Sequence, residues 1–140
     1  MIVKFTVLGE VRSKQRPRAT VINGHARVYT PKDTVMYENL VRYAYQEQVG
    51  KKLEGAIEMY CKFYFPIPKS VSKKQRAIME TETEPHLKKS DLDNCIKSVS
   101  DSIQGVAFDD DKQIYKIVAE KYYSDNPRVE VELRTKDDIG

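Results

Sequence analysis

The clearest pattern along the chain is an alternation of apolar and polar residues. Val3, Phe5 and Val7 occupy every second position near the start, which predicts a strand with one buried face. Asn23-Gly24 stands between two β-branched runs and predicts a hairpin turn. The segments predicted as strands are 2–10, 19–22, 27–30, 56–65, 113–123 and 128–134. The chain therefore holds enough strands for a sheet.

Apolar residues spaced three and four apart predict three helices, which cover 31–49, 73–80 and 91–104. The residues expected at their N-cap positions are Thr30, Ser72 and Ser90. The third helix carries an apolar stripe formed by Leu92, Cys95, Ile96, Val99 and Ile103. The order of the elements predicts a single compact α+β domain over 1–140, in which helices pack on a mixed β-sheet and residues 135–140 form a frayed tail.

Length and composition restrict the class of protein. The 140 residues suffice for one domain with its own core, and 40% hydrophobic and 32% charged residues are typical of a folded globular protein. No apolar stretch approaches the ~18 residues of a membrane span, and no signal-peptide core is present. Cys61 and Cys95 form no disulfide framework, so we expect both to be small core residues of a reduced, cytoplasmic protein.

The net charge of +3 is the remainder of two opposed segments. Residues 1–31 hold six basic side chains and one acid, whereas residues 90–111 hold six aspartates and one lysine. The basic segment suits phosphate binding, because Lys and Arg displace the counterions of nucleic acids. A solvated basic loop is the alternative. The acidic segment suits a hard cation, because clustered carboxylates repel one another until a cation or solvent screens them.

Five aspartates of the acidic segment lie near the two ends of the predicted helix 91–104. Asp91 and Asp93 fall in its first turn, and Asp109–Asp111 follow its end. Each group has a plain alternative, because the helix dipole favours first-turn acids and an acidic turn can simply be solvated. Taken together, the two groups favour a site for Mg²⁺, which takes oxygen ligands and keeps waters for substrate phosphate. Zinc is disfavoured, because no His or Cys stands at ligand spacing.

Lys97 lies four residues from both Asp93 and Asp101, on one face of the same helix. This spacing suits a surface ladder of alternating charges. It equally suits a cation that holds the scissile phosphate beside a metal ion. The two histidines, His25 and His86, are expected to be surface or structural residues.

The acidic segment resembles a known family. The sequence Asp91-Leu92-Asp93-Asn94, followed by Lys97, Asp101, Gly105, Asp110-Asp111 and Gln113, is similar to the RusA family of Holliday junction resolvases. The similarity is tight over 88–114 and extends loosely over 9–133. Members of this family are small homodimeric, Mg²⁺-dependent endonucleases, common in prophages, that nick four-way DNA junctions symmetrically.

The resemblance assigns roles to individual residues. It implies that Asp91, Asp93 and Asp111 are catalytic carboxylates that bind the metal, with Asp110 sharing the metal site. It implies that Lys97 is the catalytic lysine. Mg²⁺ is the implied cofactor, with Mn²⁺ as a substitute, and no organic cofactor is implied.

The resemblance also implies the partners and the biological role. Four-way junction DNA is the expected substrate, in DNA recombination and repair. The residues expected to contact it are Lys14, Arg16, Arg18, Lys88, Lys89 and Asn94. Paired nicks need two active sites, so we expect an intertwined or symmetric homodimer, without a membrane partner. Two alternatives stay open: a non-catalytic protein that binds branched DNA, and a metal-dependent nuclease with another structural preference.

Overall fold

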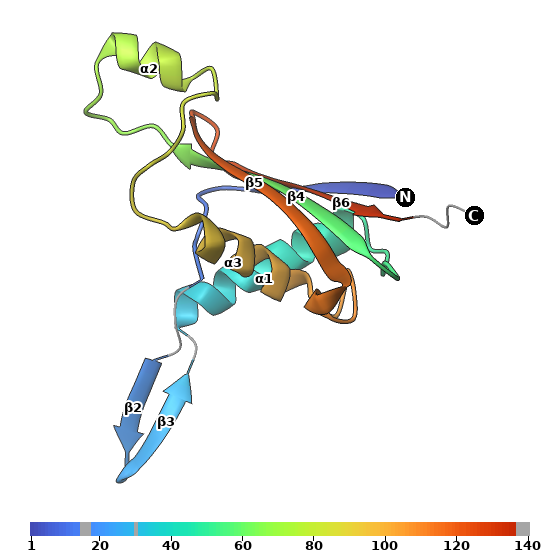
Figure 1. The fold of residues 1–140 in the computed structure, drawn as a ribbon. Helices are drawn as coiled ribbons and strands as arrows, with labels where there is room; N and C mark the ends of the chain where they lie inside the picture. Colours follow the sequence, from blue (N-terminus) through green and yellow to red (C-terminus); the bar gives the residue numbers. More distant parts are fainter. Residues whose placement is uncertain (15–17, 30, 137–140) are drawn as a thin grey trace.

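A mixed four-stranded sheet forms the centre of the molecule (Figure 1). The computed structural model describes residues 1–14, 18–29 and 31–136. The sheet has the order β1-β6-β4-β5; β4 and β5 are parallel, and the other neighbours are antiparallel. The strands are β1 (Ile2–Leu8), β4 (Ile57–Pro66), β5 (Ile114–Ser124) and β6 (Arg128–Thr135). The predicted α+β class with a mixed sheet is confirmed.

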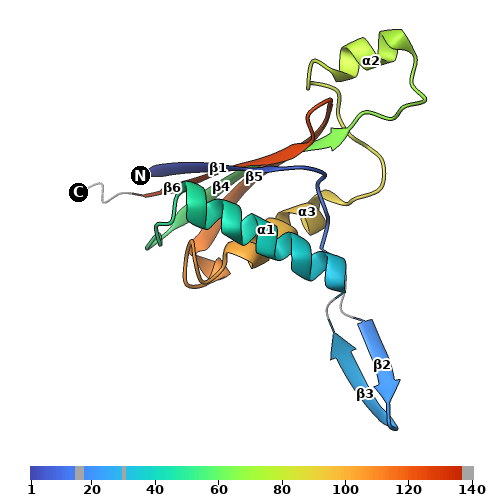
Figure 2. The same cartoon turned by 180° about the vertical axis from the view of Figure 1, so that it is seen from behind.

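Two helices, α1 (Lys32–Gln48) and α3 (Leu92–Ile103), cover one face of this sheet, as Figures 1 and 2 show. The short helix α2 (Lys73–Met79) lies beyond one end of the sheet, and the Ser72 hydroxyl caps it by accepting the Gln75 N–H, as predicted. A 3₁₀ turn, η1 (Asp111–Gln113), leads into β5 and was not predicted. Predicted and observed helix ends agree within one residue.

The core lies between the two helices and the sheet. The apolar stripe of α3 faces it as predicted, because Cys95, Val99 and Ile103 are fully buried in the same cluster as Met59 and Phe63 of β4. Spacing of three and four residues places these side chains on one side of the helix, where they leave water together.

Cys61 and Cys95 are free and buried, as expected. Burial raises the pKa of the Cys61 thiol to about 12, because a thiolate loses its hydration in the apolar core. Both thiols therefore belong to the packing of the protein.

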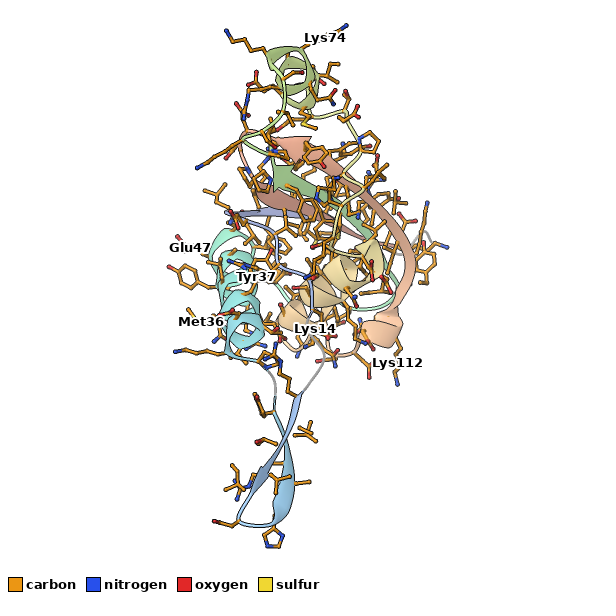
Figure 3. The ribbon with its side chains drawn as sticks, turned by 90° about the vertical axis from the view of Figure 1, so that its left-hand side faces the viewer. Lys14, Met36, Tyr37, Glu47, Lys74 and Lys112 are labelled. Carbon is orange, nitrogen blue, oxygen red and sulfur yellow. The ribbon has the colours of Figure 1, made fainter. Side chains whose placement is uncertain are left out.

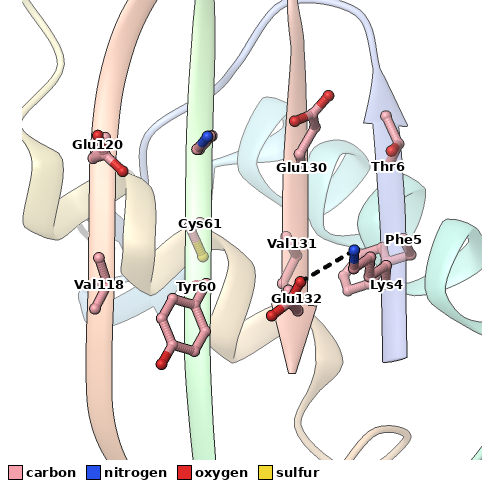
Figure 4. Close-up of a pocket in the computed structure, with 11 residues that line it drawn as sticks. Lys4, Phe5, Thr6, Tyr60, Cys61, Val118, Glu120, Glu130, Val131 and Glu132 are labelled. Atoms are coloured by element: carbon pink, nitrogen blue, oxygen red, sulfur yellow. Dashed lines mark ion pairs between the residues drawn. The ribbon is translucent and has the colours of Figure 1, made fainter. Parts of the chain in front are cut away.

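None of the helices in the described residues covers the opposite face of the sheet. Figure 4 shows polar side chains from all four strands on this face, among them Glu120 of β5, Glu130 and Glu132 of β6 and Lys4 of β1. Lys4 and Glu132 form an ion pair of 3.4 Å. The alternation of more and less buried residues along β1, β4 and β6 follows from this arrangement, since one face meets the core and the other meets water.

Two strands, β1 and β5, form the edges of the sheet. Gln48 at the end of α1 bonds the β1 edge at Thr6: its amide oxygen accepts the Thr6 N–H at 2.9 Å and its amide nitrogen donates to the Thr6 carbonyl at 2.8 Å. At this residue a side-chain amide thus takes the place of a neighbouring strand.

The two ends of the described chain lie close together (Figure 2). The Thr135 N–H donates to the Met1 carbonyl at 3.0 Å, and the Lys136 N–H donates to the Ala56 carbonyl at 3.3 Å. Ordered pairing therefore continues into the segment expected to fray, whose remainder, 137–140, lies outside the described residues. No helix in the described part of the chain is long and apolar enough to cross a membrane.

Candidate active site

The first acidic pair lies at the start of α3. Asp91 is the N-cap residue and its side chain makes no capping hydrogen bond, while Asp93 lies in the first turn. Both side chains are exposed. Ser90, predicted as the N-cap, instead has a φ of 108° and precedes the helix. The Asp91 carboxylate is therefore not used to cap the helix and faces solvent beside Asp93.

Lys121 of β5 holds this turn in place. Its ammonium donates to the Ser90 carbonyl at 2.8 Å from a half-buried position. Burial raises the pKa of the Cys95 thiol to about 11, and the charges of Lys121, Asp91 and Asp93 all act on that thiol. These three charges therefore surround the same end of α3.

The sequence reasoning missed Lys121. The alternate residues 117, 119, 121 and 123 of β5 face the helices. A lysine within this series was the signal in the sequence. A charge on the covered face of a strand requires a polar partner. Here the partner is the backbone carbonyl just before Asp91.

Lys97 lies one turn after Asp93 and is exposed. The ladder Asp93–Lys97–Asp101 does not form, because Asp101 pairs with Lys14 at 3.4 Å. Among the described residues, no carboxylate lies within ion-pair distance of Lys97. Its ammonium is thus available to an anion from outside the chain. Asn94, on the same helix, is half-buried, and its backbone carbonyl accepts the backbone N–H of Lys14 at 3.1 Å.

The second acidic group surrounds η1. Asp109 pairs with Lys52, and Asp110 accepts the Lys112 N–H at 2.9 Å. This backbone hydrogen bond, with a further contribution from the Asp111 side chain, lowers the pKa of Asp110. Gln113 completes a capping box with Asp110 by accepting its backbone N–H at 3.1 Å. Asp110 therefore has a structural task, while Asp111 is exposed beside it.

The two acidic groups lie at opposite ends of α3. A 12-residue helix is about 18 Å long. The strand β5 gives a second measure of this separation. Asp91 adjoins Ser90, which Lys121 contacts, whereas Asp111 lies shortly before the first residue of β5, Ile114. The seven residue steps from Ile114 to Lys121 span roughly 23 Å. In the described part of the chain, no three acidic, histidine or cysteine side chains converge as a metal site does. The carboxylate donors suit Mg²⁺ chemically, but one chain does not gather them.

Lys14, predicted to contact DNA, is integrated into the fold. Its ammonium lies 3.1 Å from Glu38 of α1 and 3.4 Å from Asp101 of α3, with only 20% of the side chain exposed. Burial lowers the pKa of Lys14, but the two carboxylates raise it further, so the net pKa is above its usual value. Lys14 therefore links the two helices, and a contact with DNA would have to compete with both ion pairs.

The other predicted DNA contacts differ in their positions. Arg18 is exposed at the start of the hairpin β2 (Arg18–Ile22) and β3 (His25–Tyr29), which projects away from the body (Figures 1 and 3). This hairpin also carries Arg27 and no acid. Lys88 and Lys89 are exposed on the segment that leads into α3. Arg16 lies outside the described residues.

The structure defines an α+β domain with two exposed acidic groups, and sequence comparison supplies the family. The chain belongs to the family described as Endodeoxyribonuclease RusA, which it matches over residues 9–134. It is also similar to the "Uncharacterized protein YqaN" of Bacillus subtilis (strain 168), with 35% identity over 140 residues, covering 94% of this chain and 95% of that protein. The predicted family is confirmed.

Proposed function

We propose that this protein is a Mg²⁺-dependent endodeoxyribonuclease that resolves four-way DNA junctions by paired symmetric nicks. Membership of the endodeoxyribonuclease family supports the reaction class. The observation that carries the proposal is the division of α3: its inner side forms core, while Asp91 and Asp93 stand exposed at its start and Lys97 stands exposed one turn further along. Exposed carboxylates beside an ammonium that has no ion-pair partner among the described residues suit a site that meets a cation and a phosphate.

The residues that would hold Mg²⁺ are Asp91, Asp93 and Asp111, with Asp110 adjacent. The bound ion would lower the pKa of a coordinated water and neutralise charge on the phosphoryl oxygens. Lys97 would bind a non-bridging oxygen of the scissile phosphate. Lys121 would fix the backbone before Asp91 through the Ser90 carbonyl, which keeps the first acidic pair in position.

A homodimer follows from the geometry of this proposal. Because α3 separates Asp91 and Asp93 from Asp110 and Asp111, the two pairs reach one ion only when different copies supply them. A C₂ dimer repeats such a shared site twice, and two sites match the two strands that junction resolution must nick.

The path of the DNA would follow the exposed basic residues. Arg18 on the hairpin and Lys88 and Lys89 beside the start of α3 would contact phosphates. Such contacts position the substrate and carry little sequence information. Junction structure, rather than base sequence, would then dominate binding. The cytoplasmic location expected for such an enzyme stays a prediction.

The test is cleavage of a labelled four-way junction in the presence of Mg²⁺. Asp93→Asn should abolish nicking and retain junction binding, because the substitution removes one ligand charge and little volume. Asp33→Asn is the matched control, since Asp33 is an exposed acid in the first turn of α1. Native-rate cleavage by Asp93→Asn would refute the metal assignment. Binding without nicks by the wild type would indicate a binding protein, and broad cutting of linear DNA a general nuclease.

A further inference from the structure

We propose that the hairpin of β2 and β3 is a wedge that binds the branch point of a DNA junction. Its apolar face would lie against a base pair that is unstacked there, and its basic face would meet the surrounding phosphates. This proposal rests on the function proposed above and names the part of the substrate that the hairpin contacts. It commits to DNA as the occupant of the apolar face.

The hairpin has two chemically different faces. Residues paired directly across an antiparallel ladder share a face, and successive residues of one strand alternate between faces. The pairs Ala19–Val28 and Val21–Ala26 therefore form one face, which is wholly apolar. The other face holds Arg18, Thr20, Ile22, His25, Arg27 and Tyr29. Both arginines of the hairpin thus lie on the face opposite to the valines.

The apolar face is open to water. All ten strand residues of the hairpin are exposed, so no part of the described chain covers either face. The side chains of Val21 and Val28 are the most exposed, with 70% and 73% of their surface accessible. Figures 1 and 3 show the hairpin projecting away from the sheet and the helices. A lone two-stranded hairpin is marginally stable in water, and covering its apolar face would stabilise it.

Charge indicates what covers this face. Residues 18–29 include two arginines and no acid, which suits a polyanion. The chain belongs to a family of endodeoxyribonucleases, so the polyanion that it meets is DNA. Phosphates match the basic face of the hairpin, and the flat surfaces of the bases match its apolar face.

An intact duplex offers only one of these two surfaces. The walls of a groove carry phosphates, and its floor presents the polar edges of the bases. The apolar surfaces of the base pairs are covered by stacking along the whole duplex. They become accessible where stacking is interrupted, and apolar side chains of architectural proteins enter DNA in this way. A branch point interrupts stacking and is surrounded by the phosphates of the exchanging strands, so it fits both faces of the hairpin.

The attachment of the hairpin gives such a wedge a use in the reaction. The backbone N–H of Lys14, which precedes the hairpin, donates to the backbone carbonyl of Asn94 at 3.1 Å. The segment that leads into the hairpin is thus fastened beside Asp93, at the start of α3. Five residues of strand span about 17 Å. A branch point seated on the hairpin would therefore place phosphates near the branch point, rather than along the arms, beside Asp91 and Asp93.

The first experiment measures stacking at the branch point. A four-way junction carries 2-aminopurine, whose fluorescence is quenched by stacking, in a base pair next to the branch point. With Ca²⁺ in place of Mg²⁺, binding of the wild type should raise the fluorescence about twofold or more, because aliphatic side chains replace a stacked base pair. The same probe in the middle of one arm is the control and should not change. An unchanged signal at the branch point of a fully bound junction would overturn the proposal.

The second experiment changes the apolar face alone. Val21→Thr combined with Val28→Thr replaces one methyl group of each side chain by a hydroxyl and keeps the β-branched shape that favours a strand. This double variant should bind the junction about tenfold more weakly, because two hydroxyls would lose water against the base pair. A duplex closed by a loop at each end presents no free base-pair surface, so its affinity should stay unchanged.

Val118→Thr is the matched control, since Val118 is an exposed valine on the open face of the central sheet. It should bind the junction and the closed duplex as the wild type does. Equal weakening on both substrates by the hairpin double variant would place its apolar face in a groove and overturn the wedge. Wild-type affinity of that variant for the junction would overturn it as well.

The outcomes separate this proposal from the proposed function. A wild type that raises the branch-point signal but cuts no junction in Mg²⁺ would support the wedge and refute the nuclease. A wild type that nicks junctions in Mg²⁺ without raising the signal would refute the wedge and leave the nuclease standing. A wild type that binds no junction with either ion would refute both.

Discussion

Lys14 offers a sharp test of how the basic segment is used. In Lys14→Met the long apolar stem remains and the ammonium is lost, so Glu38 and Asp101 face each other without a counter-charge. Their oxygens lie 3.1 and 3.4 Å from the same nitrogen, hence at most about 6.5 Å apart. At an effective dielectric constant of about 20, two such charges repel by about 2.5 kcal/mol. Allowing for relaxation, we expect a loss of about 2 kcal/mol in the free energy of unfolding.

The assay is urea unfolding followed by circular dichroism. With a slope of about 1.5 kcal/mol per molar, the midpoint should fall by roughly 1.3 M. Arg18→Met is the control: it removes an exposed arginine from the hairpin and should leave the midpoint unchanged. Lys14→Met combined with Glu38→Gln should recover much of the loss, because the repulsion disappears. Equal midpoints for Lys14→Met and Arg18→Met would refute the structural role of Lys14.

Two further predictions concern pH and salt. Burial, with help from the Lys121 charge, lowers the pKa of His86 below its ordinary value of 6.5, so the unfolded chain takes up the proton first. Stability should therefore fall as the pH drops through about 6.5 toward the folded pKa, and His86→Phe should abolish this dependence in thermal unfolding. Replacing both Arg18 and Arg27 by Ala should make the dependence of log affinity on log salt for junction binding less steep. The magnitude of the slope should fall by about 1.8, if each arginine contacts one phosphate.

Each of these two predictions has a control variant. His25→Phe alters an exposed histidine on the hairpin and should keep the wild-type pH dependence of unfolding. An identical loss of pH dependence in both histidine variants would contradict the assignment to His86. Lys62→Ala, on the open face of the sheet, should leave the salt slope unchanged. A hairpin variant with the wild-type slope would place the phosphate contacts elsewhere.

Local signals in the sequence predicted most of the fold. Alternation and helical spacing located the central strands and the helices within a residue or two, because these periods directly reflect burial on one face. The stripe on α3 faces the core as predicted, with Val99 and Ile103 fully buried. His86, expected to be surface or structural, is buried and stacks on Phe65 with the ring centres 3.9 Å apart.

The parts that sequence reasoning missed depend on contacts between distant segments. Lys14 resembled a free basic residue because its partners Glu38 and Asp101 stand 24 and 87 positions away. Ser90 was favoured as a cap by residue type, yet Lys121 fixes its backbone in another conformation. The spacing of the acids along the chain also does not give the distance between the two groups in space. The structure shows that the whole of α3 separates them.

The amide of Gln48 has a consequence for the size of any assembly. A sheet with two open edges can add copies without limit, because each added copy offers a fresh edge, and the result is a fibre. Here the Thr6 N–H and carbonyl are already bonded to Gln48, so another strand could pair at this point of the edge only by displacing that amide. A single glutamine at the end of a helix therefore protects the middle of this edge against pairing with another sheet.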